Sequence, residues 1–279
     1  MEVHMQYKTL NNGVEIPQLG YGVYKIPEHD IVQATLTALE SGYRSIDTAQ
    51  YYQNEQGVGK AIKTSQIPRE ELFITSKVWN SHQGYNKTIE AFEMSMDKLG
   101  LERLDMYLVH WPAPEHDLYI ETYEALEKLH KDGRIRAIGV CNFEIEHLKR
   151  LLDTCEIQPV VNQIECHPYL QQNELKTFCE EQDIFIESWA PLKRGGTLFE
   201  EDIIRELANK HNKTPAQIVL RWHIQEGSIA IPKSVTPSRI KENIEIFDFE
   251  LTEEDMINIG TLDRNERMGR HPNEMNLME

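Results

Sequence analysis

The sequence predicts an α/β protein, a (β/α)8 barrel folded as one domain over residues 1–279. Short apolar runs alternate with helical periods from one end of the chain to the other, which is the pattern of repeated strand–helix units. The length of 279 residues suits one large barrel or two small domains. No run is followed by the Gly-x-Gly-x-x-Gly sequence typical of an open doubly wound sheet, so that fold is the weaker alternative.

The strands are predicted from composition and turn signals. Asn12-Gly13, a common hairpin turn, lies within the segment Lys8–Pro17, and we expect this hairpin to cover the bottom of the barrel. Eight apolar runs then have the length of strands that are buried on both faces. In chain order they are Leu19–Val23, Arg44–Ala49, Leu72–Lys77, Met106–His110, Ala137–Cys141, Val160–Glu165, Ile184–Ala190 and Ile229–Lys233.

The helices are predicted from apolar residues that recur every three or four positions. Four such faces are Ile31, Ala34, Thr35 and Ala38; Ile89, Phe92, Met96 and Leu99; Tyr123, Leu126 and Leu129; and Ile145, Leu148 and Leu152. Gly42, Gly100 and Gly133 are suited to end the first three helices. Two later helices are predicted from their starts, because Thr214 precedes proline and a capping-box Gln217, and Thr252 precedes three acidic residues.

The composition excludes several classes of function. A formal net charge of -17 disfavours binding to nucleic acid and to anionic membrane surfaces. No apolar run has the roughly 20 residues of a membrane span, and Met1–Leu10 has no signal-peptide core, so we expect a cytoplasmic protein. The four cysteines form no Cys-x-x-Cys pair and are expected to be reduced. The histidines show no metal-binding spacing, and we expect no metal and a monomer or weak oligomer.

Polar residues follow the apolar runs at the points where barrel enzymes place their chemistry. Asp47, Lys77 and His110 end the second, third and fourth predicted strands, and Tyr52 follows Asp47 closely. Each residue alone is most simply a helix cap, a salt-bridged residue or a core histidine. Together, on neighbouring strands, they form a credible acid–base site.

The chemistry of these side chains suits the reduction of a carbonyl. Hydride addition leaves negative charge on the carbonyl oxygen, which requires a donor that supplies a proton. Free tyrosine has a pKa of about 10, and the neighbouring ammonium of Lys77 is expected to lower that pKa for Tyr52. Asp47 would keep Lys77 charged and oriented, and His110 would be the second donor to the oxygen.

At these residues the chain resembles the aldo-keto reductase family. The segment from Asp47 to Glu55 is similar to the family's DTAxxYxNE motif, and Thr75-Ser76-Lys77 and Val109-His110-Trp111-Pro112 resemble its lysine and histidine segments. The resemblance extends over nearly the whole chain. It implies that Asp47, Tyr52, Lys77 and His110 are the catalytic tetrad, with Tyr52 rather than Tyr51 as the acid.

A phosphate site is predicted from the residues themselves. Thr236 and Pro237 mark a helix start, so Arg239 falls in the first helical turn and Lys233 lies just before it. Two cations at the positive end of a helix dipole are unfavourable unless an anion binds there. A solvated basic turn is the alternative. In the family, the matching Lys, Ser and Arg bind the adenosine 2′-phosphate, which favours NADPH over NADH.

The remaining cofactor residues are implied by the resemblance. Gln163 and Asn142 match residues that bind the nicotinamide amide, and Trp189 matches the aromatic residue that stacks on the ring. Cys141 stands where serine is usual, and a thiol is a weak donor. Asn142 could instead cap the helix that contains Ile145. The implied cofactor set is Asn142, Gln163, Trp189, Leu192, Lys233, Ser234, Val235, Thr236, Arg239, Glu242 and Asn243.

The substrate is predicted to be a small aldehyde, dicarbonyl or ketone. Tyr24, Trp79, His110 and Trp111 would line its pocket, although each aromatic side chain could equally pack in the barrel. The segment Pro112–Tyr119 and the tail after Arg267 are short, as in the bacterial branch that includes glyoxal, methylglyoxal and 2,5-diketogluconate reductases. Short segments leave little wall for a large apolar substrate. The alternative function is an NADPH-binding regulatory barrel with little turnover.

Overall fold

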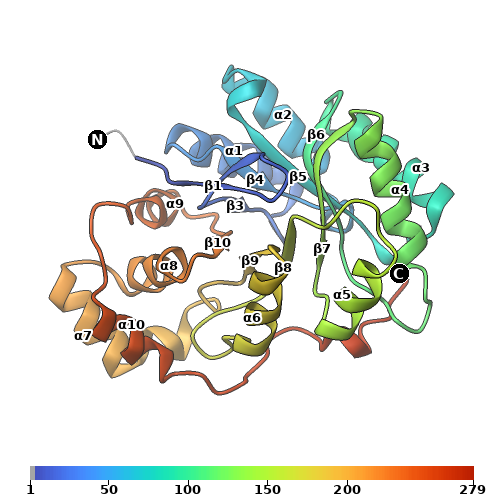
Figure 1. Ribbon diagram of the computed structural model, residues 1–279. Helices are drawn as coiled ribbons and strands as arrows, with labels where there is room; N and C mark the ends of the chain where they lie inside the picture. Colours follow the sequence, from blue (N-terminus) through green and yellow to red (C-terminus); the bar gives the residue numbers. More distant parts are fainter. Residues whose placement is uncertain (1–3) are drawn as a thin grey trace.

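The computed structural model describes residues 4–279 and confirms the predicted barrel (Figure 1). Neighbouring strands run parallel in chain order. They are β3 (Tyr21–Gly22), β4 (Ser45–Asp47), β5 (Phe73–Val78), β6 (Leu104–Val109), β7 (Ile135–Cys141), β8 (Val161–Glu165), β9 (Phe185–Trp189) and β10 (Ile229–Ala230). Leu19 forms a parallel bridge with Ala230, and the Gly20 amide donates to the Ala230 carbonyl at 2.8 Å, so the last strand meets the first.

The predicted hairpin is present and covers the bottom of the barrel. Strand β1 (Tyr7–Thr9) pairs antiparallel with β2 (Glu15–Pro17). Leu10 and Ile16 are buried against residues near the N-terminal ends of the strands, such as Phe73 and Ile229. This end of the barrel is therefore closed with apolar side chains, and chemistry is confined to the other end.

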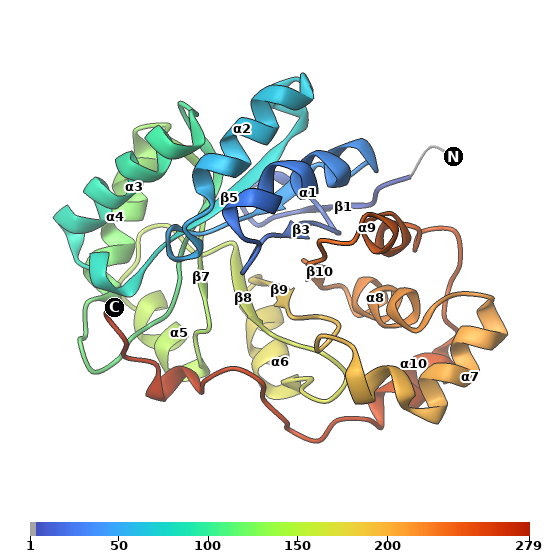
Figure 2. The same ribbon diagram turned by 180° about the vertical axis from the view of Figure 1, so that it is seen from behind.

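Helices surround the strands as predicted (Figures 1 and 2). The helices that follow the eight strands are α1 (Glu28–Glu40), α2 (Glu55–Ser65), α3 (Tyr85–Leu99), α4 (Tyr119–Lys131), α5 (Ile145–Leu152), α6 (Asn173–Glu181), α8 (Pro215–Gln225) and α9 (Pro237–Ile244). Helix α7 (Asp202–His211) precedes α8, and α10 (Glu253–Gly260) packs beside α7. Thr214 and Thr252 both form capping boxes, as their sequences predict.

Several predicted strand limits were wrong for identifiable reasons. Strands β6 and β7 begin earlier than predicted, because charged Asp105 and Arg136 interrupt the apolar runs. In the fold these two side chains pair, with Arg136 Nη1 at 2.8 Å from Asp105 Oδ1, so both positions fit within strands. Strand β10 ends at Ala230 and not, as predicted, at Lys233. Pro232 lies between these two residues, and it has no amide proton to pair with a neighbouring strand.

Alternate side chains of each strand point into the barrel, and the strand register determines which of them lie at the same level. Lys77 and Leu108 are register partners on β5 and β6, and Gln163 pairs with both Cys141 and Glu187 on the strands that flank it. Apolar side chains at the same inward positions lower in the barrel, among them Met106 and Val161, form the interior core. The apolar core thus fills the lower part of the barrel, and Lys77, Gln163 and Glu187 lie above it, near the carboxyl ends of the strands.

The chain after α10 crosses the open end of the barrel. Figure 2 shows this last segment running from α10 past α6 and α5 to the neighbourhood of α4. Within residues 4–279 no helix is long and apolar enough to cross a membrane. The same part of the chain contains no cluster of three or more His, Cys, Asp or Glu side chains suited to a metal ion.

Candidate active site

A cavity of about 1120 Å³ opens at the carboxyl ends of the strands. Its walls come from the loops after β3, β4, β6 and β9, from the start of α9 and from the C-terminal segment. Of the predicted catalytic residues, Asp47, Tyr52 and His110 line it, and Lys77 lies directly behind them, fully buried. The four side chains come from β4, from β5, from the loop after β4 and from the residue directly after β6, and they therefore meet at one point.

Lys77 holds the centre of this group. Its Nζ lies 2.6 Å from Asp47 Oδ1, 2.9 Å from the Thr48 carbonyl oxygen and 3.3 Å from the Tyr52 hydroxyl. These three acceptors use all three protons of an ammonium group. The Lys77 side chain cannot rotate away without breaking its buried ion pair with Asp47. The ammonium is therefore held beside the Tyr52 hydroxyl.

The charges of these groups follow from their surroundings. Burial alone would lower the pKa of Lys77, but Asp47, Tyr52 and Cys141 together outweigh burial and raise the pKa, so the ammonium stays charged. The prediction that Lys77 lowers the pKa of Tyr52 below its ordinary value was wrong in sum. Burial raises the pKa of Tyr52 well above 10, and Lys77 offsets only part of that rise. Tyr52 is therefore held as a neutral hydroxyl that has a proton to donate.

His110 is held as a neutral ring. Burial, and then the charge of Lys77, lower the pKa of His110 well below 6.5. Its Nδ1 is buried without a partner in residues 4–279, whereas the ring lines the cavity between Tyr52 and Trp79. A buried lone pair costs less than a stranded N–H, so we assign the proton to Nε2. His110 then presents a donor and no positive charge.

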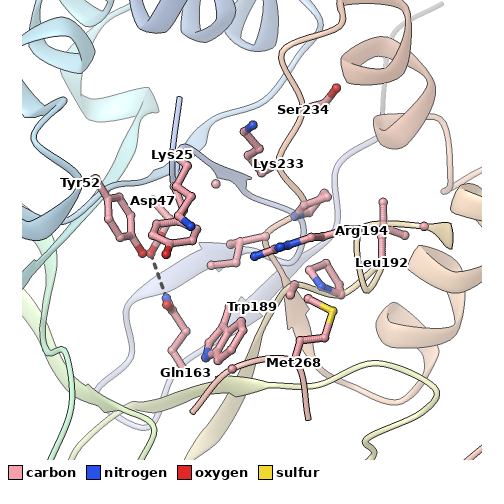
Figure 3. A pocket seen from close by; sticks show the side chains of 18 of the residues that line it. Lys25, Asp47, Tyr52, Gln163, Trp189, Leu192, Arg194, Lys233, Ser234 and Met268 are labelled. Atoms are coloured by element: carbon pink, nitrogen blue, oxygen red, sulfur yellow. Dashed lines mark hydrogen bonds between the residues drawn. The ribbon is translucent and has the colours of Figure 1, made fainter. Parts of the chain in front are cut away.

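Three of the predicted cofactor residues are held by hydrogen bonds at the inner end of the cavity. Gln163 Nε2 donates to Asp47 Oδ2 at 2.9 Å, the bond drawn in Figure 3. Asn142 Nδ2 donates to the His110 carbonyl at 3.0 Å, and its Oδ1 accepts from Trp189 Nε1 at 2.8 Å. Asn142 is not the cap of α5, because Glu144 occupies that position. Cys141 is fully buried in the interior core and is not among the lining residues.

Trp189 is fixed from a second side. A Cβ atom at Gly269 would lie 2.7 Å from Trp189 Cη2, so the C-terminal segment passes this ring as closely as a glycine permits. The neighbouring amides of Met268 and Gly269 donate to the buried Glu165 carboxylate at 2.6 and 2.8 Å. The indole is held between Asn142 and a firmly anchored backbone, with its remaining surface toward the cavity.

Cations surround the outer half of the cavity. Lys25, Arg194 and Lys233 extend toward its middle in Figure 3, and Arg239 lines it from the first turn of α9. None of the four forms an ion pair with another described residue. Burial, and then the charge of Arg194, lower the pKa of Lys233. Four unpaired cations in a chain with a net charge of -17 indicate an anion site.

The structure brings together the whole predicted cofactor set. The lining residues from this set are Asn142, Gln163, Trp189, Leu192, Lys233, Ser234, Val235, Thr236, Arg239, Glu242 and Asn243. Glu242 Oε1 accepts a hydrogen bond from Thr214 at 2.7 Å, which joins α9 to the start of α8. The predicted substrate residues Tyr24, Trp79, His110 and Trp111 line the inner half of the same cavity.

The tail was expected to leave this half open, and that expectation was wrong. Met275 and Leu277 line the cavity. The segment is held there because Asn80 Nδ2 donates to the Leu277 carbonyl at 2.9 Å and Trp79 Nε1 donates to the Glu279 carbonyl at 3.2 Å. Tyr51 also belongs to this wall, stacked on Trp79 with ring centroids 3.8 Å apart. The inner half is thus walled largely by aromatic side chains and by the C-terminal segment.

Sequence reasoning missed several residues in or directly behind the cavity wall that carried a usable signal. Lys193-Arg194-Gly195-Gly196 begins three residues after the end of a predicted strand, where two cations before two glycines suggest a loop that binds an anion. Lys25 follows the first strand in the same way. Glu187 is an acidic residue within an otherwise weakly polar strand, which indicates an inward-facing functional position. Met275 and Leu277 gave no such signal.

The fold and site define a barrel with a tyrosine that lines the cavity against a buried lysine, a neutral histidine and a group of cations in the outer half of the cavity. The model of the Aldo/keto reductase family matches residues 18–264, and the chain belongs to this family. The "Glyoxal reductase" of Bacillus subtilis is 52% identical over 267 residues, covering 95% of this chain and 96% of that protein. The "Methylglyoxal reductase DkgA" of Salmonella typhimurium is 49% identical, covering 95% and 96%.

A solved structure is similar along nearly the whole chain. A mutant of Gox0644 in complex with NADPH has a TM-score of 0.93 and 45% sequence identity, and the match covers 97% of this chain and 98% of that one. The predicted family and barrel are therefore confirmed.

Proposed function

We propose that this protein is an NADPH-dependent reductase of small aldehydes, dicarbonyls or ketones, with Tyr52 as the general acid. The observation that carries the proposal is the Lys77 ammonium, fully buried, 2.6 Å from Asp47 and 3.3 Å from the Tyr52 hydroxyl. A barrel that only bound a cofactor would gain nothing from burying this cation beside a phenol, which costs desolvation energy.

The donor set of the cavity fits NADPH. Lys233 and Arg239 suit a phosphate on the ribose, and Arg194 with Lys25 suits a diphosphate nearer the middle. The Trp189 ring suits a flat nicotinamide, and Gln163 and Asn142 suit its carboxamide. A similar protein is known with NADPH bound, and two relatives carry the names of glyoxal and methylglyoxal reductases.

The residues of the inner half would carry out the proton transfer. When bound, the cofactor supplies a hydride to the carbonyl carbon. The carbonyl π electrons move onto oxygen as the new C–H bond forms, and Tyr52 donates its proton to that oxygen while His110 Nε2–H holds it. Lys77 stabilises the phenolate that remains on Tyr52, and Asp47 balances the charge of Lys77.

The aromatic inner half sets the size of the substrate. Tyr51, Trp79 and the Leu277 segment narrow the space beside His110, so a bulky ketone would have to displace packed side chains. A small dicarbonyl fits without this cost, and its electron-poor carbonyl accepts hydride more readily. The expected preference for small carbonyl substrates therefore arises because the C-terminal segment excludes bulky ketones, and not because the cavity lacks a wall to bind them.

We expect kcat/KM to be highest for small activated carbonyls. The measurement compares methylglyoxal, a simple aromatic aldehyde and a steroid ketone with saturating NADPH. A steroid ketone preferred by about tenfold, equivalent to about 1.4 kcal/mol in transition-state binding, would contradict the proposed substrate class. Tight NADPH binding without turnover of any of the three would instead favour a regulatory barrel.

Arg239→Ala is expected to weaken NADPH binding by about tenfold to hundredfold while changing NADH binding little. Only NADPH carries the 2′-phosphate, and a hydrogen bond to a charged group is worth about 1.5–3 kcal/mol. Calorimetric titration with each cofactor measures both effects. Arg205→Ala, which removes a cation from the outer helix α7, is the matched control. Equal losses for NADPH and NADH would show that Arg239 does not bind the 2′-phosphate.

A further inference from the structure

Glu187 is a buried acid that the proposed reaction does not use. It lies in the middle of β9, is 1% exposed and is the register partner of Gln163 on β8. Its Oε2 accepts a hydrogen bond from Gln163 Nε2 at 2.8 Å. A carboxyl group at such a position is costly to bury, which calls for a reason beyond packing.

The amide nitrogen of Gln163 is shared between two carboxyl groups. One proton of Nε2 goes to Asp47 Oδ2 at 2.9 Å and the other goes to Glu187 Oε2 at 2.8 Å. An amide has only two such protons, so the donor capacity of Gln163 is exhausted. Its carbonyl oxygen Oε1 accepts no hydrogen bond from residues 4–279, while the residue lines the cavity.

The two hydrogen bonds fix the orientation of the Gln163 amide, which one hydrogen bond alone would not do. With Asp47 alone, the amide plane of Gln163 could turn about its single hydrogen bond and still satisfy it. With Glu187 added from a different strand, both the position of the nitrogen and the tilt of the plane are fixed. A flipped amide would place its oxygen against Asp47, whose negative charge is held by Lys77. The acceptor oxygen is therefore left toward the cavity in one orientation.

The role of Glu187 does not depend on its protonation state. Burial, and then the negative charge of Asp47, raise the pKa of Glu187 to about 7. The titratable groups that face it are Asp47 from β4, Lys77 from β5 and Cys141 from β7. Oxygen Oε2 accepts from Gln163 as a carboxylate and also as the carbonyl oxygen of a neutral acid.

We propose that Glu187 is a positioning residue that, with Asp47, fixes the amide plane of Gln163 so that its Oε1 accepts a hydrogen bond from the NH₂ of the cofactor carboxamide. This inference rests on the proposed function, because it requires a nicotinamide in the cavity. It extends the catalytic network into one chain of side chains, from Glu187 through Gln163, Asp47 and Lys77 to Tyr52. Gln163, which would orient the nicotinamide, is then connected by hydrogen bonds to Tyr52, which would donate the proton.

The test compares NADP⁺ with its 3-acetylpyridine analogue, in which a methyl group replaces the carboxamide NH₂. Only NADP⁺ can donate to Gln163 Oε1. Calorimetric titration of the wild type is expected to give about tenfold tighter binding of NADP⁺ than of the analogue, the scale of one well-placed hydrogen bond. In Glu187→Leu this ratio is expected to fall to about threefold or less, because the oxygen is no longer held in place.

Matched variants separate positioning from general damage. Glu187→Gln keeps an acceptor oxygen at this point and is expected to retain the wild-type ratio. Cys141→Ala changes the other register partner of Gln163, which makes no hydrogen bond to its amide, and should also retain it. Glu187→Met provides the same test if Glu187→Leu does not fold.

The outcomes distinguish the two claims. A folded Glu187→Leu or Glu187→Met protein that binds NADP⁺ and keeps the tenfold ratio overturns the role of Glu187. If Glu187→Gln loses the preference for NADP⁺ over the analogue as fully as Glu187→Leu does, the positioning role of Glu187 is overturned as well. A wild-type protein that binds neither NADP⁺ nor its analogue refutes the proposed function itself.

Discussion

Replacing Tyr52 with phenylalanine is expected to reduce kcat by about 10²- to 10⁴-fold, the usual contribution of general acid catalysis. The hydroxyl is the only part removed, and it is the group that Lys77 contacts at 3.3 Å. Burial holds Tyr52 neutral, so the proton is present across the working pH range. Affinity for NADPH should stay nearly unchanged, because the phenol acts on the substrate oxygen. Single-turnover kinetics and a separate NADPH titration measure the two effects.

The neighbouring tyrosine supplies the control. Tyr51 stacks on Trp79, is exposed and has no contact with Lys77, so Tyr51→Phe should change kcat only slightly. A folded Tyr52→Phe protein with near-wild-type turnover would remove Tyr52 from the role of acid. A large loss in Tyr51→Phe instead would mean that the acid is the other tyrosine of this pair.

The site was predictable where function requires particular residue types at strand ends. Asp47, Lys77 and His110 are polar residues that follow apolar runs, and the strands of a barrel deliver their ends to one place. The cavity positions of Lys233 and Arg239 were predictable because two cations at a helix start favour a bound anion. Their roles, together with a cytoplasmic location and a monomeric or weakly oligomeric state, stay predictions.

The rest depends on register and on contacts between distant segments. Glu187 acts through Gln163 only because the two are register partners, and sequence periodicity does not determine register between strands. The wall formed by Leu277 depends on Asn80, nearly two hundred residues earlier in the chain. The pKa of Tyr52 depends on the balance between burial and Lys77, and the sequence reveals the charge but not the burial.

The balance of charge in the barrel interior depends on Lys77. Its ammonium is fully buried and pairs with Asp47, whose side chain is 3% exposed. A second carboxyl group, Glu187, lies beyond Gln163 in the same network. Removing the only cation of this group would leave an uncompensated buried negative charge, which is the most costly way to break a buried ion pair.

Lys77→Met is therefore expected to destabilise the protein by about 3–5 kcal/mol at pH 8, in addition to abolishing most turnover. The loss should be smaller at pH 5, because Glu187, whose pKa burial and Asp47 raise to about 7, is protonated there and no longer adds negative charge. Lys77 itself adds no pH dependence between these values, since its pKa is raised and the wild-type ammonium stays charged throughout. Urea unfolding followed by circular dichroism at the two pH values gives both free energies of unfolding.

The double variant Asp47→Asn/Lys77→Met decides whether charge is the cause. It removes both members of the ion pair, so it should recover most of the stability that Lys77→Met loses at pH 8, although it remains inactive. Neutral amides can still accept from Gln163 at the position of Asp47. If the double variant is as unstable as Lys77→Met, the loss comes from packing around the lysine chain. If Lys77→Met matches the wild type at pH 8, the interior tolerates the unpaired carboxylate and the proposed charge balance is wrong.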